Sequence, residues 1–143
     1  MIPFVHLHVH SYYSILDGQA SISRLVDKAI ADGMRGMALT DHGSMMGVKD
    51  FHNYVQKKKS GASNDFKKAE TVLKELQAKI EESNADPMTT ILEDGRVLSD
   101  AIAETKKAMD KAKRVMAFKP IIGCEMYCAR RTKFDKTLKE DRS

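Results

Sequence analysis

Residues 6–11 read HLHVHS and hold three of the five histidines of the chain. Successive side chains of an extended strand point to opposite faces, so His6, His8 and His10 would share one face. The apolar residues between them would share the other. We therefore expect a strand over residues 4–10 that faces helices on its apolar side and a polar site on its histidine side.

The residues after this stretch predict alternating helices and strands. Ser21 is a good N-cap, residues 22–30 place apolar side chains at helical spacing, and Gly33 suits a left-handed helix end. The apolar run 37–40 then precedes a second helix of roughly a dozen residues, beginning near Val48. Repeated β-α units favour an α/β fold of parallel strands, with functional side chains where each strand opens into its loop.

Residues 60–118 interrupt this rhythm. Their apolar residues step by three and four, which predicts two helices joined by a polar loop that includes residues 84–87 and 93–95. An antiparallel hairpin is the simplest arrangement, either packed on itself or serving as a partner-binding arm. After it, residues 120–128 predict a third, buried strand, whereas 130–143 are charged and lack apolar periodicity.

The composition is that of a folded domain. The chain has 143 residues, 42% of them apolar, and a net charge of +4, with Lys and Arg in excess over Asp and Glu in residues 1–59 and 119–143. This distribution would favour a partner with phosphates. The start lacks a secretory signal, and no run approaches the ~20 apolar residues of a membrane span, so we expect a cytoplasmic protein without membrane contact. Cys124 and Cys128 are expected to be reduced and buried.

Titratable residues gather at the predicted strand ends. His8 and His10, two apart on one strand, can hold one metal ion between their rings, and the other groups add carboxylates and a third imidazole. An isolated strand histidine is more often a hydrogen-bonded core residue, but several such groups buried together are costly without a cation. Imidazoles and carboxylates without thiolate favour Zn, Mn or Fe. The candidate ligands are His8, His10, Asp17, Asp41, His42 and Glu125.

Three other residues are set aside. His6 should lie deeper in the first strand and serve in packing or support. His52 lies on the predicted apolar face of the second helix, which favours a core or interface role. Ser11 has no base to activate it as a nucleophile, and a metal site would make such a base unnecessary.

Four motifs stand out along the chain: HVHS (8–11), ILDG (15–18), ALTDHG (38–43) and PIIGCEMY (120–127). Together they resemble the PHP (polymerase and histidinol phosphatase) domain, in particular the branch found at the amino terminus of bacterial DNA polymerase III alpha subunits. The resemblance covers residues 4–57 and 119–131.

The resemblance implies a distorted seven-stranded β/α barrel that carries up to three metal ions. It assigns His8 and His10 to the first ligand motif, Asp17 to the next loop, Asp41 and His42 to the second motif and Glu125 to a metal-bridging position. Such a barrel needs about 250 residues. We therefore expect residues 1–143 to be the N-terminal part of a PHP domain, with an inserted helical hairpin at 60–118, that self-associates or has little activity alone.

The same resemblance implies a role in DNA replication, within a DNA-directed DNA polymerase, a nucleotidyltransferase. The site itself would be a multi-metal phosphoesterase, acting as a 3'-5' exonuclease or a pyrophosphatase, with Asp41 and His42 as catalytic residues. Its partners would be the rest of the alpha subunit and, through it, DNA. A structural module that docks a proofreading subunit is the alternative, and a stand-alone metallophosphatase is a third reading.

Overall fold

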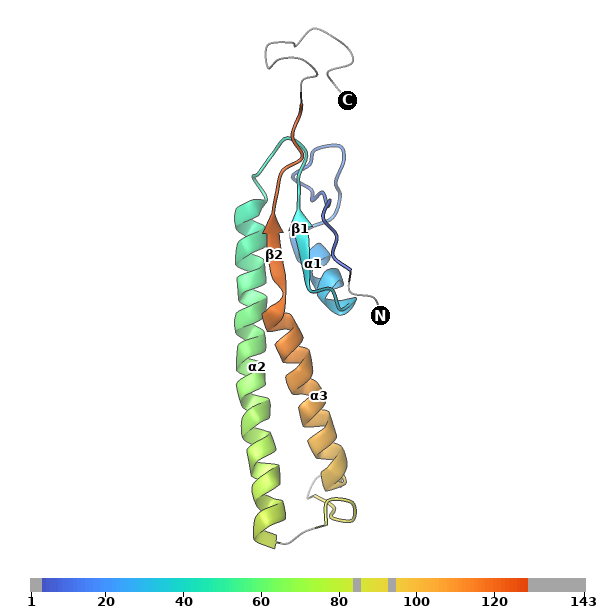
Figure 1. Ribbon diagram of the computed structural model, residues 1–143, viewed down its shortest axis with the longest axis vertical. Coiled ribbons are helices and arrows are strands. Elements are labelled where there is room, and N and C mark those ends of the chain that lie inside the picture. The colour runs from blue at the N-terminus through green and yellow to red at the C-terminus, as the bar shows by residue number, and fades with distance from the viewer. Residues whose placement is uncertain (1–3, 84–85, 93–94, 129–143) are drawn as a thin grey trace. The chain divides into compact units, whose positions relative to one another are not determined.

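The computed structural model describes residues 4–83, 86–92 and 95–128. These residues form three α-helices and a two-stranded parallel sheet, which is an α/β arrangement (Figure 1). The chain divides into two compact units: residues 1–55 with 119–143, and residues 56–118. The predicted charged segment 130–143 lies outside the described residues, as do residues 84, 85, 93 and 94 of the predicted loop. Among the described residues, no helix is apolar over a stretch long enough to cross a membrane.

The first helix and strand agree with the sequence prediction. Helix α1 spans Ile22–Ala31; the hydroxyl of Ser21 caps its start, and Gly33 follows its end with a φ of +77°. It contacts strand β1, Gly36–Leu39, whose four residues are all buried. The apolar helix face packs because its residues recur every three or four positions. The buried helix residues are Ile22, Val26 and Ala29.

Residues 4–10 do not form the predicted strand. They run beside β1 in the same direction, since the amide of Ala38 donates to the His6 carbonyl and that of Thr40 donates to the Val9 carbonyl. However, the Val9 amide donates to the Thr40 hydroxyl at 2.9 Å. A side chain thus takes the place of a backbone acceptor, and regular pairing ends there.

Strand β2, Lys119–Ile122, pairs in parallel with β1, placing Gly36 opposite Lys119 and Leu39 opposite Ile122 (Figure 1). It is shorter than predicted, and the prediction that it is buried is wrong: Ile121 is 39% exposed and Ile122 48%. Among the described strands β2 pairs with β1 alone, so no strand lies against its other edge.

Helix α2, Val48–Ser83, is far longer than the predicted dozen residues. It does not end near residue 60 as predicted and continues through Gly61, because one glycine weakens a helix by only about 1 kcal/mol and no proline follows to stop it before Ser83. In the second unit α2 runs antiparallel to α3, Leu98–Ala117 (Figure 1). Their shared core joins Leu76 to Leu98 and Ala101.

The close approach of β2 to Gly36 generates a prediction about stability. A Cβ at Gly36 would lie 2.5 Å from the carbonyl oxygen of Lys119. We expect Gly36→Ala to lower the free energy of unfolding by about 2 kcal/mol, because the strands must separate to admit the methyl group. Urea denaturation followed by circular dichroism measures this change.

Gly61→Ala is the matched control. A Cβ there meets no atom within 4 Å, and alanine favours a helix over glycine, so this variant should be more stable by up to about 1 kcal/mol. Equal stability of Gly36→Ala and the wild type would contradict the register of the sheet.

Candidate metal centre

Parallel pairing continues beyond the two strands and brings distant residues together. The amides of Gly123 and Glu125 donate to the carbonyls of Leu39 and Asp41, at 3.0 and 3.1 Å. His42 and Glu125 then face each other in an isolated parallel bridge. Residues separated by more than eighty positions thus meet where both strands end, as expected for functional residues of parallel sheets.

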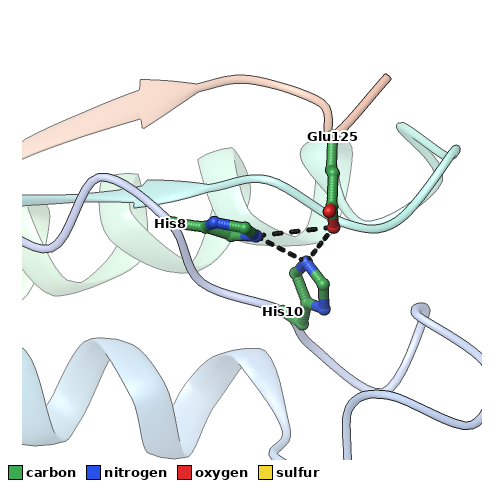
Figure 2. Close-up of side chains that lie close together, drawn as sticks. All are labelled: His8, His10 and Glu125. Carbon is green, nitrogen blue, oxygen red and sulfur yellow. Dashed lines mark hydrogen bonds and ion pairs between the residues drawn. The ribbon is translucent and has the colours of Figure 1, made fainter. Parts of the chain in front are cut away.

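Three side chains form a compact group at this end of the sheet: His8, His10 and Glu125 (Figure 2). The Nε2 atoms of His8 and His10 are 3.0 Å apart, and they lie 3.4 and 2.7 Å from Oε2 of Glu125. His8 is more exposed than His10, with 65% against 19% of its side chain accessible. The group is therefore reachable from solvent on the His8 side.

These distances fit a divalent metal ion. Ligand atoms bound tetrahedrally at 2.0 to 2.1 Å lie about 3.3 Å from one another, which is close to the three separations between these donors. Two imidazoles with one glutamate are also a donor set typical of catalytic zinc. His8, His10 and Glu125 are therefore the residues that could hold the ion.

His42 and Asp17 lie next to this group. Nδ1 of His42 is 3.1 Å from Oε2 of Glu125 and 3.6 Å from Oδ2 of Asp17. A single carboxylate oxygen thus has three imidazoles around it, from His8, His10 and His42. This central place agrees with the bridging role that the sequence motif implies for Glu125, and the role itself stays a prediction.

The imidazoles hold Glu125 in its ionised form. Desolvation acts to raise its pKa, but hydrogen bonds and charge interaction with His42, together with hydrogen bonds from His8 and His10, outweigh it, so the pKa is lowered. The ionised carboxylate of Glu125 and the nearby carboxylate of Asp17 thus offer oxygen donors beside the imidazole nitrogens. Such a site favours a cation.

The carboxylate of Asp41 is hydrogen-bonded to serine residues and not to the histidines of the group. Its side chain is buried, and its carboxylate accepts hydrogen bonds from the Ser11 amide at 2.6 Å, the Ser11 hydroxyl at 3.0 Å and the Ser14 hydroxyl at 2.9 Å. The Ser14 hydroxyl in turn accepts from the amide of His42 at 3.0 Å. Asp41 therefore joins loop 11–18 to the end of β1, and it is not one of the three clustered residues.

Several secondary expectations are wrong. His6 is exposed, with its ring edge-on to Phe4, and does not lie deep in a strand. His52 is exposed on α2 because it falls beside the apolar face that Phe51 and Val55 bury. The two cysteines are not buried: Cys124 is half-buried and Cys128 is exposed.

Sequence reasoning missed three residues that shape the site: Ser11, Ser14 and Tyr127. The hydroxyl of Tyr127 lies within hydrogen-bond reach of Nε2 of His42. A signal for it existed, because Tyr127 follows Glu125 by two positions in an extended segment and so shares its face. Ser11 and Ser14 carry no comparable signal, since their partner Asp41 lies about thirty residues away.

Comparison with known proteins agrees with this geometry. The model of the PHP domain matches residues 6–142, so the chain belongs to the PHP domain family. No solved structure matches it.

The relatives that the chain resembles are polymerases. The DNA polymerase III subunit alpha of Treponema pallidum is 58% identical over 48 residues, which are 34% of this chain and 4% of that protein. That of Borreliella burgdorferi is 52% identical over 58 residues, 41% of this chain and 5% of that protein. An error-prone DNA polymerase of Symbiobacterium thermophilum is 45% identical over 53 residues, which are 37% of this chain and 5% of that protein. The matched segment is thus a small part of each relative.

The buried contacts of Asp41 lead to a second prediction. Asp41→Ala leaves the Ser11 amide and two hydroxyls without their acceptor, so the free energy of unfolding should fall by about 3 kcal/mol. Thermal and urea denaturation of the purified protein measure the loss.

Asp32→Ala provides the control, because Asp32 pairs with Lys28 at 2.7 Å on the surface of α1. Removal of such an exposed pair should cost no more than about 0.5 kcal/mol. Equal losses for the two variants would show that the Asp41 hydrogen bonds add nothing beyond a surface contact.

Proposed function

We propose that this chain is the N-terminal part of the PHP domain of a DNA polymerase III alpha subunit and that its site binds divalent metal ions. The observation that carries the proposal is the set of three imidazoles around one oxygen of Glu125. Ligand residues, donor types and distances all suit Zn, Mn or Fe. The identity over the amino-terminal segment supports the polymerase context.

The family supports a view of the first unit as half of a β/α barrel. Its sheet has a neighbour on one side of β2 only, among the described strands, and apolar residues stand exposed there. On this proposal, residues 60–118 are a helical hairpin inserted between two β-α units. The uncovered edge explains why the chain alone would self-associate or show little activity.

The proposed chemistry is hydrolysis of a phosphoester or pyrophosphate. A bound divalent ion supplies Lewis-acid polarisation of a phosphoryl oxygen and a lowered pKa for bound water. His8, His10 and Glu125 hold the ion. His42, with Nδ1 directed to two carboxylates, is positioned to hold a proton at that atom, and Asp17 to orient it. Asp41 enters as a positioning residue, because its oxygens are occupied by Ser11 and Ser14.

The substrate in this proposal is the 3' end of a DNA strand or the pyrophosphate that synthesis releases. In the parent polymerase the site would act beside DNA in the cytoplasm. The exposed side of His8 leaves a path for a phosphate group to approach the ion.

A structural role is the second candidate function. The same residues come from three segments, namely the amino-terminal segment, the end of β1 and the continuation of β2. An ion held among them would fasten these segments together and stabilise a docking module for the polymerase and its proofreading subunit. Metal binding without hydrolysis is the result that this alternative predicts.

The test begins with metal content. Purified protein, first stripped with chelator, is titrated with zinc and analysed by calorimetry and elemental analysis. We expect His8→Ala/His10→Ala to weaken zinc binding at least a hundredfold, because two of three donors are lost. His52→Ala removes an exposed histidine outside the group and should bind like the wild type.

Hydrolysis is then measured on 3'-labelled single-stranded DNA and on pyrophosphate with the loaded protein. Metal-dependent product that disappears in the double variant supports the phosphoesterase. Zinc binding equal in the wild type and the double variant would refute the site itself.

A further inference from the structure

Charge is unevenly distributed along the helical hairpin of the second unit. Over residues 60–118 the charges nearly cancel, with ten lysines and arginines against eleven aspartates and glutamates. However, residues 70–105 have nine acidic residues and three basic ones, whereas residues 56–69 and 106–117 together have ten basic residues and two acidic ones. We call the half of the hairpin built from these last two segments the basic half.

The two segments of the basic half lie side by side. Helices α2 and α3 run antiparallel (Figure 1), and the ammonium group of Lys113 on α3 lies 5.6 Å from the ring centroid of Phe66 on α2. The positive charges of both segments therefore add up in one region of the second unit.

One face of α3 gathers four of these cations. They occupy positions i, i+1, i+5 and i+8, on the side of the helix opposite the buried Ala101 and Ala112, and all four side chains are exposed. Asp110 is the one acidic residue among them in the sequence. Within the described residues, no carboxylate forms an ion pair with any of the four. This basic face consists of Lys106, Lys107, Lys111 and Arg114.

The stability of α3 does not explain the basic face. Lys107 and Lys111 stand four positions apart, where like charges repel each other and destabilise a helix. The helix dipole accounts only for Arg114, the basic residue of the last turn. A bound anion would relieve the repulsion among these side chains.

The phosphate backbone of a nucleic acid fits this face. Residues 106–114 span about 12 Å of helix, and duplex DNA carries about seven phosphates over that length. Lysine and arginine contact phosphates without reading the base sequence. A lipid surface fits poorly, because α3 exposes no large apolar side chain that could enter a bilayer.

We propose that the basic face of α3 binds the phosphate backbone of duplex DNA without sequence preference. Three exposed lysines of the basic half on α2 strengthen the positive field that attracts the duplex. The choice of DNA among nucleic acids rests on the proposed function, which assigns the chain to a polymerase. Binding of phosphates rests on the charges alone, and none of these residues belongs to the metal centre. The three lysines are Lys57, Lys67 and Lys68.

The test is the fluorescence anisotropy of a fluorescein-labelled DNA duplex titrated with the whole chain at several salt concentrations. A chelator is present, so that no metal ion contributes. We expect Lys107→Gln/Lys111→Gln to reduce the slope of log K against log salt by about 2, because each lost phosphate contact removes about 0.9. Affinity at about 0.1 M salt should fall at least tenfold.

Lys74→Gln/Lys79→Gln is the matched control, because it makes the same change of charge on α2 outside the basic half. It should keep the wild-type affinity and slope. Lys107→Arg/Lys111→Arg preserves both charges and should also bind like the wild type. Glutamine favours a helix and the replaced side chains are exposed, so both glutamine variants should keep the wild-type melting temperature.

Four results would overturn the inference. The first is a wild type that does not bind the duplex at low salt, and the second is an equal loss of affinity in the two glutamine variants. The third is displacement of the labelled duplex by polyglutamate as effectively as by unlabelled duplex, which would indicate an acidic protein partner. The fourth is tighter binding to phosphatidylserine vesicles or to duplex RNA than to duplex DNA.

Zinc titration keeps this inference separate from the proposed function. The metal-centre variant His8→Ala/His10→Ala should bind the duplex like the wild type. If the wild type binds DNA through the basic face but binds no zinc, the proposed metal centre fails and the inference stands. If zinc binds and the duplex does not, the inference fails alone.

Discussion

A buried carboxylate, that of Asp41, accepts hydrogen bonds from one amide and two hydroxyls of the loop that follows the first histidines. Ionised carboxylates are costly to bury unless their oxygens are satisfied, and Ser11 and Ser14 satisfy them here. The contact fixes where residues 8–10 end relative to β1. Because the Ser14 hydroxyl also receives the His42 amide, the neighbouring imidazole is held in the same place.

The register of the sheet supplies the other half of the site. Pairing that begins at Gly36 and Lys119 continues to His42 and Glu125, so a shift by one residue would turn Glu125 away from the imidazoles. Residues two apart in an extended segment lie on the same side of it. Two such pairs contribute to the site: His8 with His10, and Glu125 with Tyr127. A donor set of imidazoles and carboxylate then forms without any ligand being placed by a helix.

Part of this arrangement could be predicted from the sequence. The cap, periodicity and terminal glycine of α1 are local signals, and the α/β class followed from the repeated units. Because strand ends of a parallel sheet meet, the sequence predicts one group of six candidate ligands, and the structure brings His8, His10 and Glu125 of these six into one cluster. The other three are Asp17, Asp41 and His42. The engagement of Asp41 could not be predicted, because its partners are hydroxyls some thirty residues away whose positions depend on the folded loop.

Other differences between the predicted and the observed fold arise from tertiary contacts, which the periodicity of apolar residues does not reveal. Residues 4–10 alternate like a strand, yet the Thr40 hydroxyl takes the Val9 amide and interrupts the ladder. The apolar run of β2 resembles a buried strand, but burial depends on neighbours that the sheet has on one side only among the described residues. Helix α2 passes through Gly61 because its neighbouring turns hold it together despite the weak position.

We propose that Glu125 gathers the imidazoles into one metal centre. Diffraction at the zinc absorption edge from crystals soaked in zinc shows where the ion binds. We expect an anomalous peak within about 2.0 to 2.2 Å of Nε2 of His8, Nε2 of His10 and a carboxylate oxygen of Glu125. Zinc that binds elsewhere, for example at the exposed Cys128, while this group stays without a peak, would contradict it.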